Sequence, residues 1–144
     1  MEFLNPDQLL TDAMIDQCEE ACRLVFPAPV REFYLKANGG EPEFYVFQND
    51  ELDTAVSEFL PLVSRSRGTA VQSYRRLVTE KALVPVNLFP FAVDGGGDYF
   101  FVDTSTAEGA VYFYRSDTVR DEKLVPLNLN FAAFWATPIA ERPS

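Results

Sequence analysis

The chain has 144 residues, 47% of them hydrophobic and 14% aromatic, which suits one folded domain and excludes a disordered chain. Its formal net charge of −10 argues against a nucleic-acid binder and against docking on anionic membranes, because both need clustered Lys and Arg. The absence of histidine removes the commonest general base and metal ligand, and we therefore expect no enzyme.

Apolar residues at helical spacing predict four helices. These helices are expected at residues 10–25, 29–37, 69–82 and from Asn128 or Asn130 to about 138. Asn5 and Thr11 are alternative caps for the first helix, and Thr69 can cap the third. Asn38-Gly39-Gly40 is expected to end the second helix, because Gly and Asn adopt left-handed geometry at little cost.

Runs of aromatic and β-branched residues predict short strands between these helices. The strands are expected at residues 44–47, 59–63, 89–93, 99–102, 110–114 and 125–127. The three strands between residues 89 and 114 are joined by short turns, which predicts an antiparallel meander. The predicted fold is a single α+β domain. In it, an antiparallel sheet of about four to six strands packs on helices from the N-terminus, the middle and the C-terminus.

The cysteines and the start of the chain indicate the compartment. Cys18 and Cys22 lie four residues apart on the first predicted helix, without the further ligands that a zinc site needs. We expect two buried free thiols, which fit a reducing compartment. The start MEFLNPDQLL has no basic region and no long apolar one, and no window approaches the roughly 20 apolar residues that span a bilayer. These features predict a cytoplasmic protein without a signal peptide.

The stretch Asp94-Gly95-Gly96-Gly97-Asp98 stands between two predicted strands. A phosphate loop would open onto a helix, and a calcium loop would need alternating acids and a closing Glu. Because neither pattern is present, we predict a hairpin turn with glycines at positive φ and aspartates that bind the turn amides. The sequence gives no reason to expect a metal or a cofactor.

A group of acids outnumbers the few clustered bases. The candidate partner-binding acids are Glu41, Glu43, Asp50, Glu51, Asp53, Asp94 and Asp98. They are either a solvated loop face or a docking surface for a basic protein partner, and the sequence leaves both interpretations open. The basic cluster consists of Arg65, Arg67, Arg75 and Arg76. We expect these arginines at the surface, with their charge offset by nearby acids.

Three segments, in this order, match the pattern of one family. A proline-started helix that ends in Asn-Gly-Gly is found in FPAPVREFYLKANGG. Two strands around an Asp-Gly-Gly turn, then a Gly-led aromatic strand, are found in LFPFAVDGGGDYFFVDTSTAEGAVYFYRSD. A closing helix with Phe-x-x-Phe spacing is found in LNLNFAAFWATP. Together they resemble the SUKH superfamily, which includes fungal cell-wall-assembly regulators and many bacterial immunity proteins. The resemblance spans residues 12–138 of a single domain at 1–144, with a frayed tail expected at 141–144.

The resemblance implies an α+β domain without enzymatic activity. Many bacterial members bind and neutralise a polymorphic toxin, often a nuclease, in the cytoplasm of the producing cell, and others act as interaction modules. Matching the family's two turns are Asn38, Gly39, Gly40, Asp94, Gly95, Gly96 and Asp98. The resemblance makes these positions architectural, and the extra Gly97 departs from the pattern. We therefore expect an immunity protein for a basic toxin domain, with a regulatory or scaffolding module as the alternative. The oligomeric state stays open.

Overall fold

The fold is seen in a computed structural model that describes residues 2–43, 45–49, 52–116 and 122–136. The helices are α1 (Asp12–Cys22), α2 (Ala28–Lys36), α3 (Ala70–Tyr74), the π-helix η1 (Arg75–Glu80) that continues α3, and α4 (Phe131–Ala136). The strands are β1 (Phe3–Leu4), β2 (Glu41–Pro42), β3 (Val46–Gln48), β4 (Asp53–Phe59), β5 (Leu88–Asp94), β6 (Tyr99–Asp103), β7 (Ala110–Tyr114) and β8 (Leu124–Asn130).

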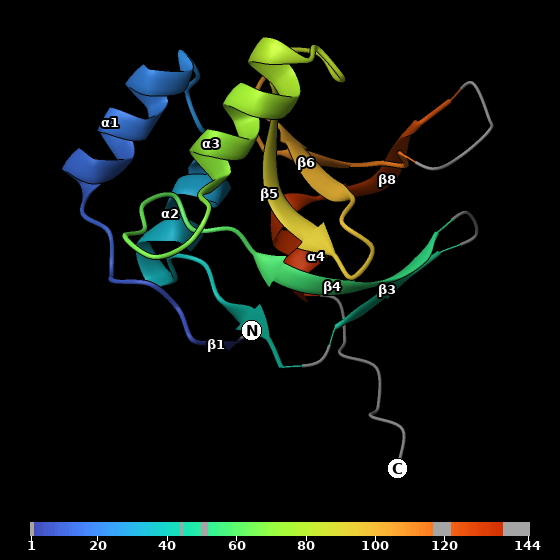
Figure 1. The fold of residues 1–144 in the computed structure, drawn as a ribbon, viewed down its shortest axis with the longest axis horizontal. Helices are drawn as coiled ribbons and strands as arrows, with labels where there is room; N and C mark the ends of the chain where they lie inside the picture. Colours follow the sequence, from blue (N-terminus) through green and yellow to red (C-terminus); the bar gives the residue numbers. More distant parts are fainter. Residues whose placement is uncertain (1, 44, 50–51, 117–121, 137–144) are drawn as a thin grey trace.

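The strands of the described residues form two sheets. Antiparallel neighbours in the order β3-β4-β5-β6-β7-β8 make a six-stranded sheet, and β1 pairs with β2 (Figure 1). The predicted α+β fold with its antiparallel meander is confirmed. The tail predicted at 141–144 and the predicted end of the last helix lie outside the described residues.

One face of the curled sheet packs on α4. The ring centroid of Phe134 lies 5.0 Å from that of Phe100 and 5.3 Å from that of Phe91. The Oδ1 atom of Asn130 accepts a hydrogen bond from the backbone N–H of Ala133 at 2.8 Å, so this residue caps the helix. Because so short a helix is not stable alone, its buried rings hold it against the strands. Replacing one such Phe by Ala typically costs about 3–5 kcal/mol.

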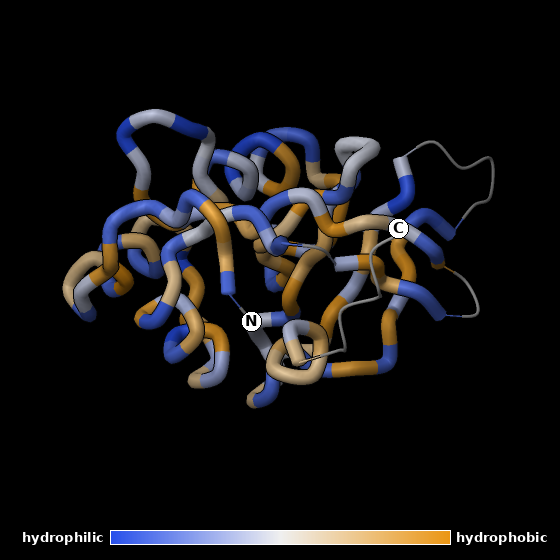
Figure 2. Tube along the Cα trace, turned by 90° about the horizontal axis from the view of Figure 1, so that it is seen from below, coloured by the Kyte–Doolittle hydropathy of each residue, from blue (hydrophilic) through white to orange (hydrophobic). Residues whose placement is uncertain are grey.

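Further aromatic contacts cover β5. Tyr74 of α3 packs on Phe89 with ring centroids 5.7 Å apart, and Phe26, which follows α1, packs on the same ring at 4.9 Å. Tyr112 and Tyr114 of β7 remain half-buried. Figure 2 shows hydrophobic stretches in the interior of the molecule and hydrophilic stretches in many outer loops. These contacts bury β5 in the middle of the sheet, whereas Tyr112 and Tyr114 keep part of their surface accessible.

The first helix is shorter than its apolar pattern predicts. The hydroxyl of Thr11 accepts a hydrogen bond from the N–H of Met14 at 3.2 Å, which makes Thr11 and not Asn5 the cap. Arg23 ends the helix in left-handed geometry, with φ at 57°. Val25 was expected on the buried stripe but is 78% exposed, because the chain turns away before it.

The predicted strand at 59–63 is wrong. The strand at this place is β4, and Pro61 and Leu62 lie beyond its end in an irregular segment. The backbone groups there bind other parts of the chain: Leu62 N–H donates to the Asn38 side chain at 2.8 Å, and the Pro61 carbonyl accepts from Ala70 at 2.8 Å. Since these partners belong to distant segments, local sequence could not reveal them.

Candidate protein-binding surface

Three hairpin connections lie at one end of the six-stranded sheet. In an antiparallel meander, the connections β3–β4, β5–β6 and β7–β8 all fall at the same end, and Figure 1 shows these strands running towards one side. Asp53, Asp94 and Asp98 lie at this hairpin end. Two further candidates, Asp50 and Glu51, lie outside the described residues. The topology thus brings together three of the predicted acids.

Two other predicted acids lie elsewhere. Glu41 belongs to β2 and stands opposite Leu4 of β1, and Glu43 follows that strand. The adjoining Gly40 bridges Phe59, which is the far end of β4 from the hairpin end. The predicted acids are therefore not one continuous surface, although both glutamates are exposed.

Asp94 is engaged within its own hairpin. Its Oδ1 accepts hydrogen bonds from the N–H groups of Gly96 at 2.9 Å and Asp98 at 2.8 Å, and its Oδ2 accepts from the Thr54 hydroxyl at 2.8 Å. Of the three glycines predicted at positive φ, only Gly97 has it, at 91°. The Asp94 carboxylate therefore closes the turn and ties it to β4.

The other two acids at the hairpin end differ in exposure, since Asp53 is exposed and Asp98 is half-buried like Asp94. Asp98 accepts hydrogen bonds from the backbone N–H of Ser116 at 3.4 Å and from its hydroxyl, which joins the β5–β6 turn to the end of β7. Asp53 is exposed, and within the described part of the chain its carboxylate accepts only one hydrogen bond, from the Gln48 amide at 3.4 Å. The exposed Asp53 carboxylate can thus face a partner from this end of the sheet, whereas the Asp98 carboxylate is engaged by Ser116.

Three tyrosines line the accessible sheet face beside these acids. The ring centroids of Phe100 and Phe113 lie 4.7 Å apart on the α4 side, and side chains alternate along a strand. Tyr99, Tyr112 and Tyr114 therefore point away from α4. Together with the residues opposite them on β8 they form what we call the tyrosine face, whose members are Tyr99, Tyr112, Tyr114, Leu124 and Pro126.

An arginine of this chain already occupies part of the tyrosine face. Arg76 of η1 donates from Nη2 to the Tyr99 hydroxyl at 2.7 Å, and its guanidinium carbon lies 5.9 Å from the centroid of the same ring. Such an arrangement combines a hydrogen bond with a cation–π contact. The sequence shows Arg76 only as a surface base, because its contact with β6 depends on how α3 and η1 dock.

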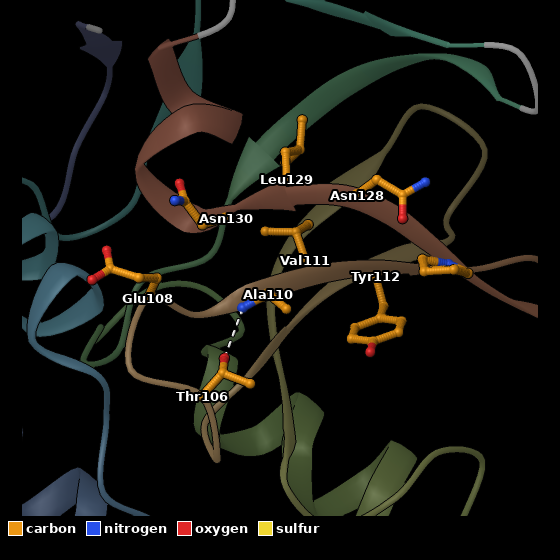
Figure 3. A pocket seen from close by; sticks show the side chains of 9 residues that line it. Thr106, Glu108, Ala110, Val111, Tyr112, Asn128, Leu129 and Asn130 are labelled. Atoms are coloured by element: carbon orange, nitrogen blue, oxygen red, sulfur yellow. Dashed lines mark hydrogen bonds between the residues drawn. The ribbon is translucent and has the colours of Figure 1, made fainter.

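A shallow notch adjoins the tyrosine face between β7 and β8. The register shifts there, from Ala110 opposite Asn130 to Tyr112 opposite Pro126, so β8 bulges. Asn128 in the bulge has φ at 60°. Figure 3 shows the notch, which has a volume of about 310 Å³. Its open shape suits a side chain of a partner better than a bound cofactor.

Residues 9–137 match the family model of the SMI1/KNR4 family (SUKH-1). The match covers nearly the whole chain. The chain belongs to the SMI1/KNR4 family. No curated protein and no solved structure gives a significant match to it. The match to the family model confirms the resemblance to the SUKH superfamily that the sequence motifs indicated.

The first turn that carries the SUKH-1 resemblance is buried. Asn38 has no exposed surface, and its Nδ2 donates to the carbonyls of Gln8 at 3.0 Å and Val63 at 2.8 Å. Gly39 has φ at +79°, and a Cβ there would lie 2.7 Å from the backbone nitrogen of Pro61. Any side chain at position 39 would collide with Pro61, so this position requires glycine. The hydrogen bonds of Asn38 join the end of α2 to two distant segments of the chain.

Two arginines in the described part of this SUKH-1 domain, Arg31 and Arg67, form ion pairs. Arg67 contacts Asp7 at 3.0 Å and Glu58 at 3.4 Å, which agrees with the expected offset by acids. The Ser64 hydroxyl and then Arg67 lower the pKa of Asp7 against the effect of burial. Sequence analysis missed Arg31, which contacts three carboxylates of α1. Only the packing of α2 against α1 brings these charges together.

The described part of this SUKH-1 domain offers few groups for chemistry. Cys18 and Cys22 are buried free thiols, as predicted. Burial raises the pKa of Cys22 to about 11, which keeps it a weakly nucleophilic thiol at neutral pH. Within the described ranges, no three His, Cys, Asp or Glu side chains are placed to hold a metal ion. The helices described are also too short or too polar to cross a membrane.

Proposed function

We propose that this SUKH-1 domain is an immunity protein, a non-enzymatic inhibitor that binds a cognate toxin in the cytoplasm of the producing cell. Membership of the family supports this, because many bacterial SUKH proteins have that role. The observation that carries the proposal is the hairpin end, where the exposed Asp53 and the half-buried Asp98 share one end of the sheet with half-buried tyrosines, in a chain of net charge −10. An acidic surface with aromatic anchors is suited to a basic protein partner.

Inhibition of this kind needs contact area and no catalytic group. A standard interface buries about 800 Å² on each partner, and the domain has a surface of 8050 Å². Toxins that act on nucleic acid need a basic surface to bind phosphates. An acidic domain that covers that surface would block the substrate and would associate quickly through electrostatic steering.

The test is protection against the toxin domain encoded beside the gene for this chain. We expect co-expression to rescue growth, and the purified proteins to form a 1:1 complex. The dissociation constant should rise at least about tenfold between 50 and 300 mM NaCl, because the attraction is screened. An unrelated toxin serves as the control and should not be neutralised.

Absence of both rescue and complex would refute the immunity role for that pair. A chain without a neighbouring toxin gene, which instead binds a host protein, would be the regulatory or scaffolding module of the same family.

A further inference from the structure

We propose that the tyrosine face docks the partner, and that it does so by receiving arginine side chains from a basic protein. This inference rests on the proposed function, since it names the surface and the chemistry of the same interaction. Four observations carry it: the direction of the tyrosine rings, the position of Arg76, the distribution of charge and the state of the edge strand.

The tyrosine rings are available to a partner. Tyr112 and Tyr114 are half-buried, and within the described part of the chain no hydrogen bond reaches either hydroxyl. The register places Tyr112 opposite Pro126 and Tyr114 opposite Leu124, so each ring has an apolar cross-strand neighbour on the same face of the sheet. Tyrosines of this kind, with fixed rings and free polar tips, are common anchors of protein interfaces.

Arg76 shows how a guanidinium fits this face. It uses the ring of Tyr99 and also the hydroxyl, at 5.9 Å and 2.7 Å respectively. A planar guanidinium can stack and donate at the same time, whereas the ammonium of lysine is a compact, strongly hydrated charge. The two neighbouring tyrosines repeat the ring and the hydroxyl without an arginine among the described residues.

The charges bordering the tyrosine face favour a cation. Strand alternation puts Glu122 on the same side as Leu124, and puts Arg115 and Lys123 on the other side. Glu122 is exposed, as is Glu108 beside the notch in Figure 3. Arg115 donates to the carbonyl of Glu122 and therefore leaves that carboxylate uncompensated. Among the residues that the structure describes, a partner's arginine would meet negative charge here and no competing base except Arg76.

The edge of the sheet argues for side-chain contacts over strand addition. β8 is the outer strand beside this face, and its Pro126 has no N–H to donate. Asn128 interrupts the extended path of the same strand with φ at 60°. A partner strand could not continue a regular ladder along such an edge.

The acids of α1 are a weaker competitor for a basic partner. Asp12, Asp16 and Glu19 already share Arg31, at 3.1, 2.7 and 3.0 Å. The sequence of α1 itself, DAMIDQCEEAC, contains no aromatic residue on which an arginine could stack. In the peptide-binding experiment below, these acids of α1 are the alternative binding site with which the tyrosine face is compared.

The decisive measurement is the affinity of the neighbouring toxin domain for tyrosine variants of the full chain. We expect Tyr112→Ala and Tyr114→Ala each to raise the dissociation constant at least tenfold, and Tyr112→Phe to raise it less than about threefold because the ring remains. Leu9→Ala, at a residue 71% exposed away from the sheet face, is the control and should change nothing. Circular dichroism checks that each variant is folded.

Equal affinities for all variants would overturn the docking surface and leave the proposed function intact. A second arm tests the surface without the toxin. Deca-arginine peptide, followed by amide chemical shifts, should perturb β6, β7 and β8, bind several-fold more tightly than deca-lysine, and bind weakly to Tyr112→Ala. Perturbation centred on α1, or equal binding of the two peptides, would overturn the inference even if the toxin binds.

Discussion

Asp94 accepts three hydrogen bonds from its own hairpin and from β4, so its contribution to folding can be measured apart from partner binding. We predict that Asp94→Ala lowers the free energy of unfolding by about 2 kcal/mol, since each hydrogen bond contributes about 1 kcal/mol and water replaces part of the loss. Asp94→Asn should cost less than about 1 kcal/mol, because the amide oxygen still accepts and Thr54 can reverse its bond. Urea unfolding gives both values.

The matched control for Asp94 is Asp53→Asn, at an exposed acid of the same sheet end. It should change the free energy of unfolding by less than about 0.5 kcal/mol. Equal stability of Asp94→Ala and Asp53→Asn would contradict the structural role of Asp94. Protection from the toxin by Asp94→Asn should persist, since its carboxylate is turned into the hairpin.

Sequence alone could predict the type of turn around Asp94, because Gly and Asp have local conformational preferences. It could not predict which φ angles would be positive, nor that Thr54 would bind Asp94 from 40 residues away. Arg31 was missed for the same reason. Its acids lie on another helix, and no local pattern links a base to carboxylates 12 to 19 residues earlier.

At the level of secondary-structure elements, the start of α3 is held by a capping box. The Thr69 hydroxyl accepts from the N–H of Gln72 at 3.1 Å, and the Gln72 side chain accepts from the N–H of Thr69 at 3.0 Å. We predict that Thr69→Ala lowers the free energy of unfolding by about 1 kcal/mol. Thr69→Ser should keep most of it, because the oxygen remains. Thr79→Ala, at an exposed residue of η1, is the control. The free energy of unfolding is measured by thermal or urea unfolding, and an equal loss for Thr79→Ala and Thr69→Ala would contradict the role of the cap.

Elements with a local signal were predicted and those set by tertiary contacts were not. The cap at Thr69 and the alternation in β7 are local, and the structure has both. The strand β4 was missed because its register shifts near Ser57, which breaks the period-two pattern. The change from α3 to a π-helix at Arg75 has no sequence signal that we recognised. The tyrosine face could have been found from the alternation of Tyr112 and Tyr114 with buried Phe113, had the direction of α4 been known.

For the whole molecule, the net charge of −10 predicts how stability responds to salt. Excess negative charge destabilises the compact state, and salt screens it over a Debye length of about 10 Å at 0.1 M. Ion pairs at Arg31 and Arg67 would weaken in salt, but they are partly exposed and contribute about 1 kcal/mol or less each. We therefore predict that raising NaCl from 20 to 300 mM at pH 7 raises the melting temperature by about 2–5 °C. In a variant with Glu2, Glu20 and Glu32 changed to Gln, the melting temperature should rise less with the same increase in NaCl. All three glutamates are exposed in the wild type. A melting temperature that falls with salt would mean that the ion pairs outweigh the repulsion.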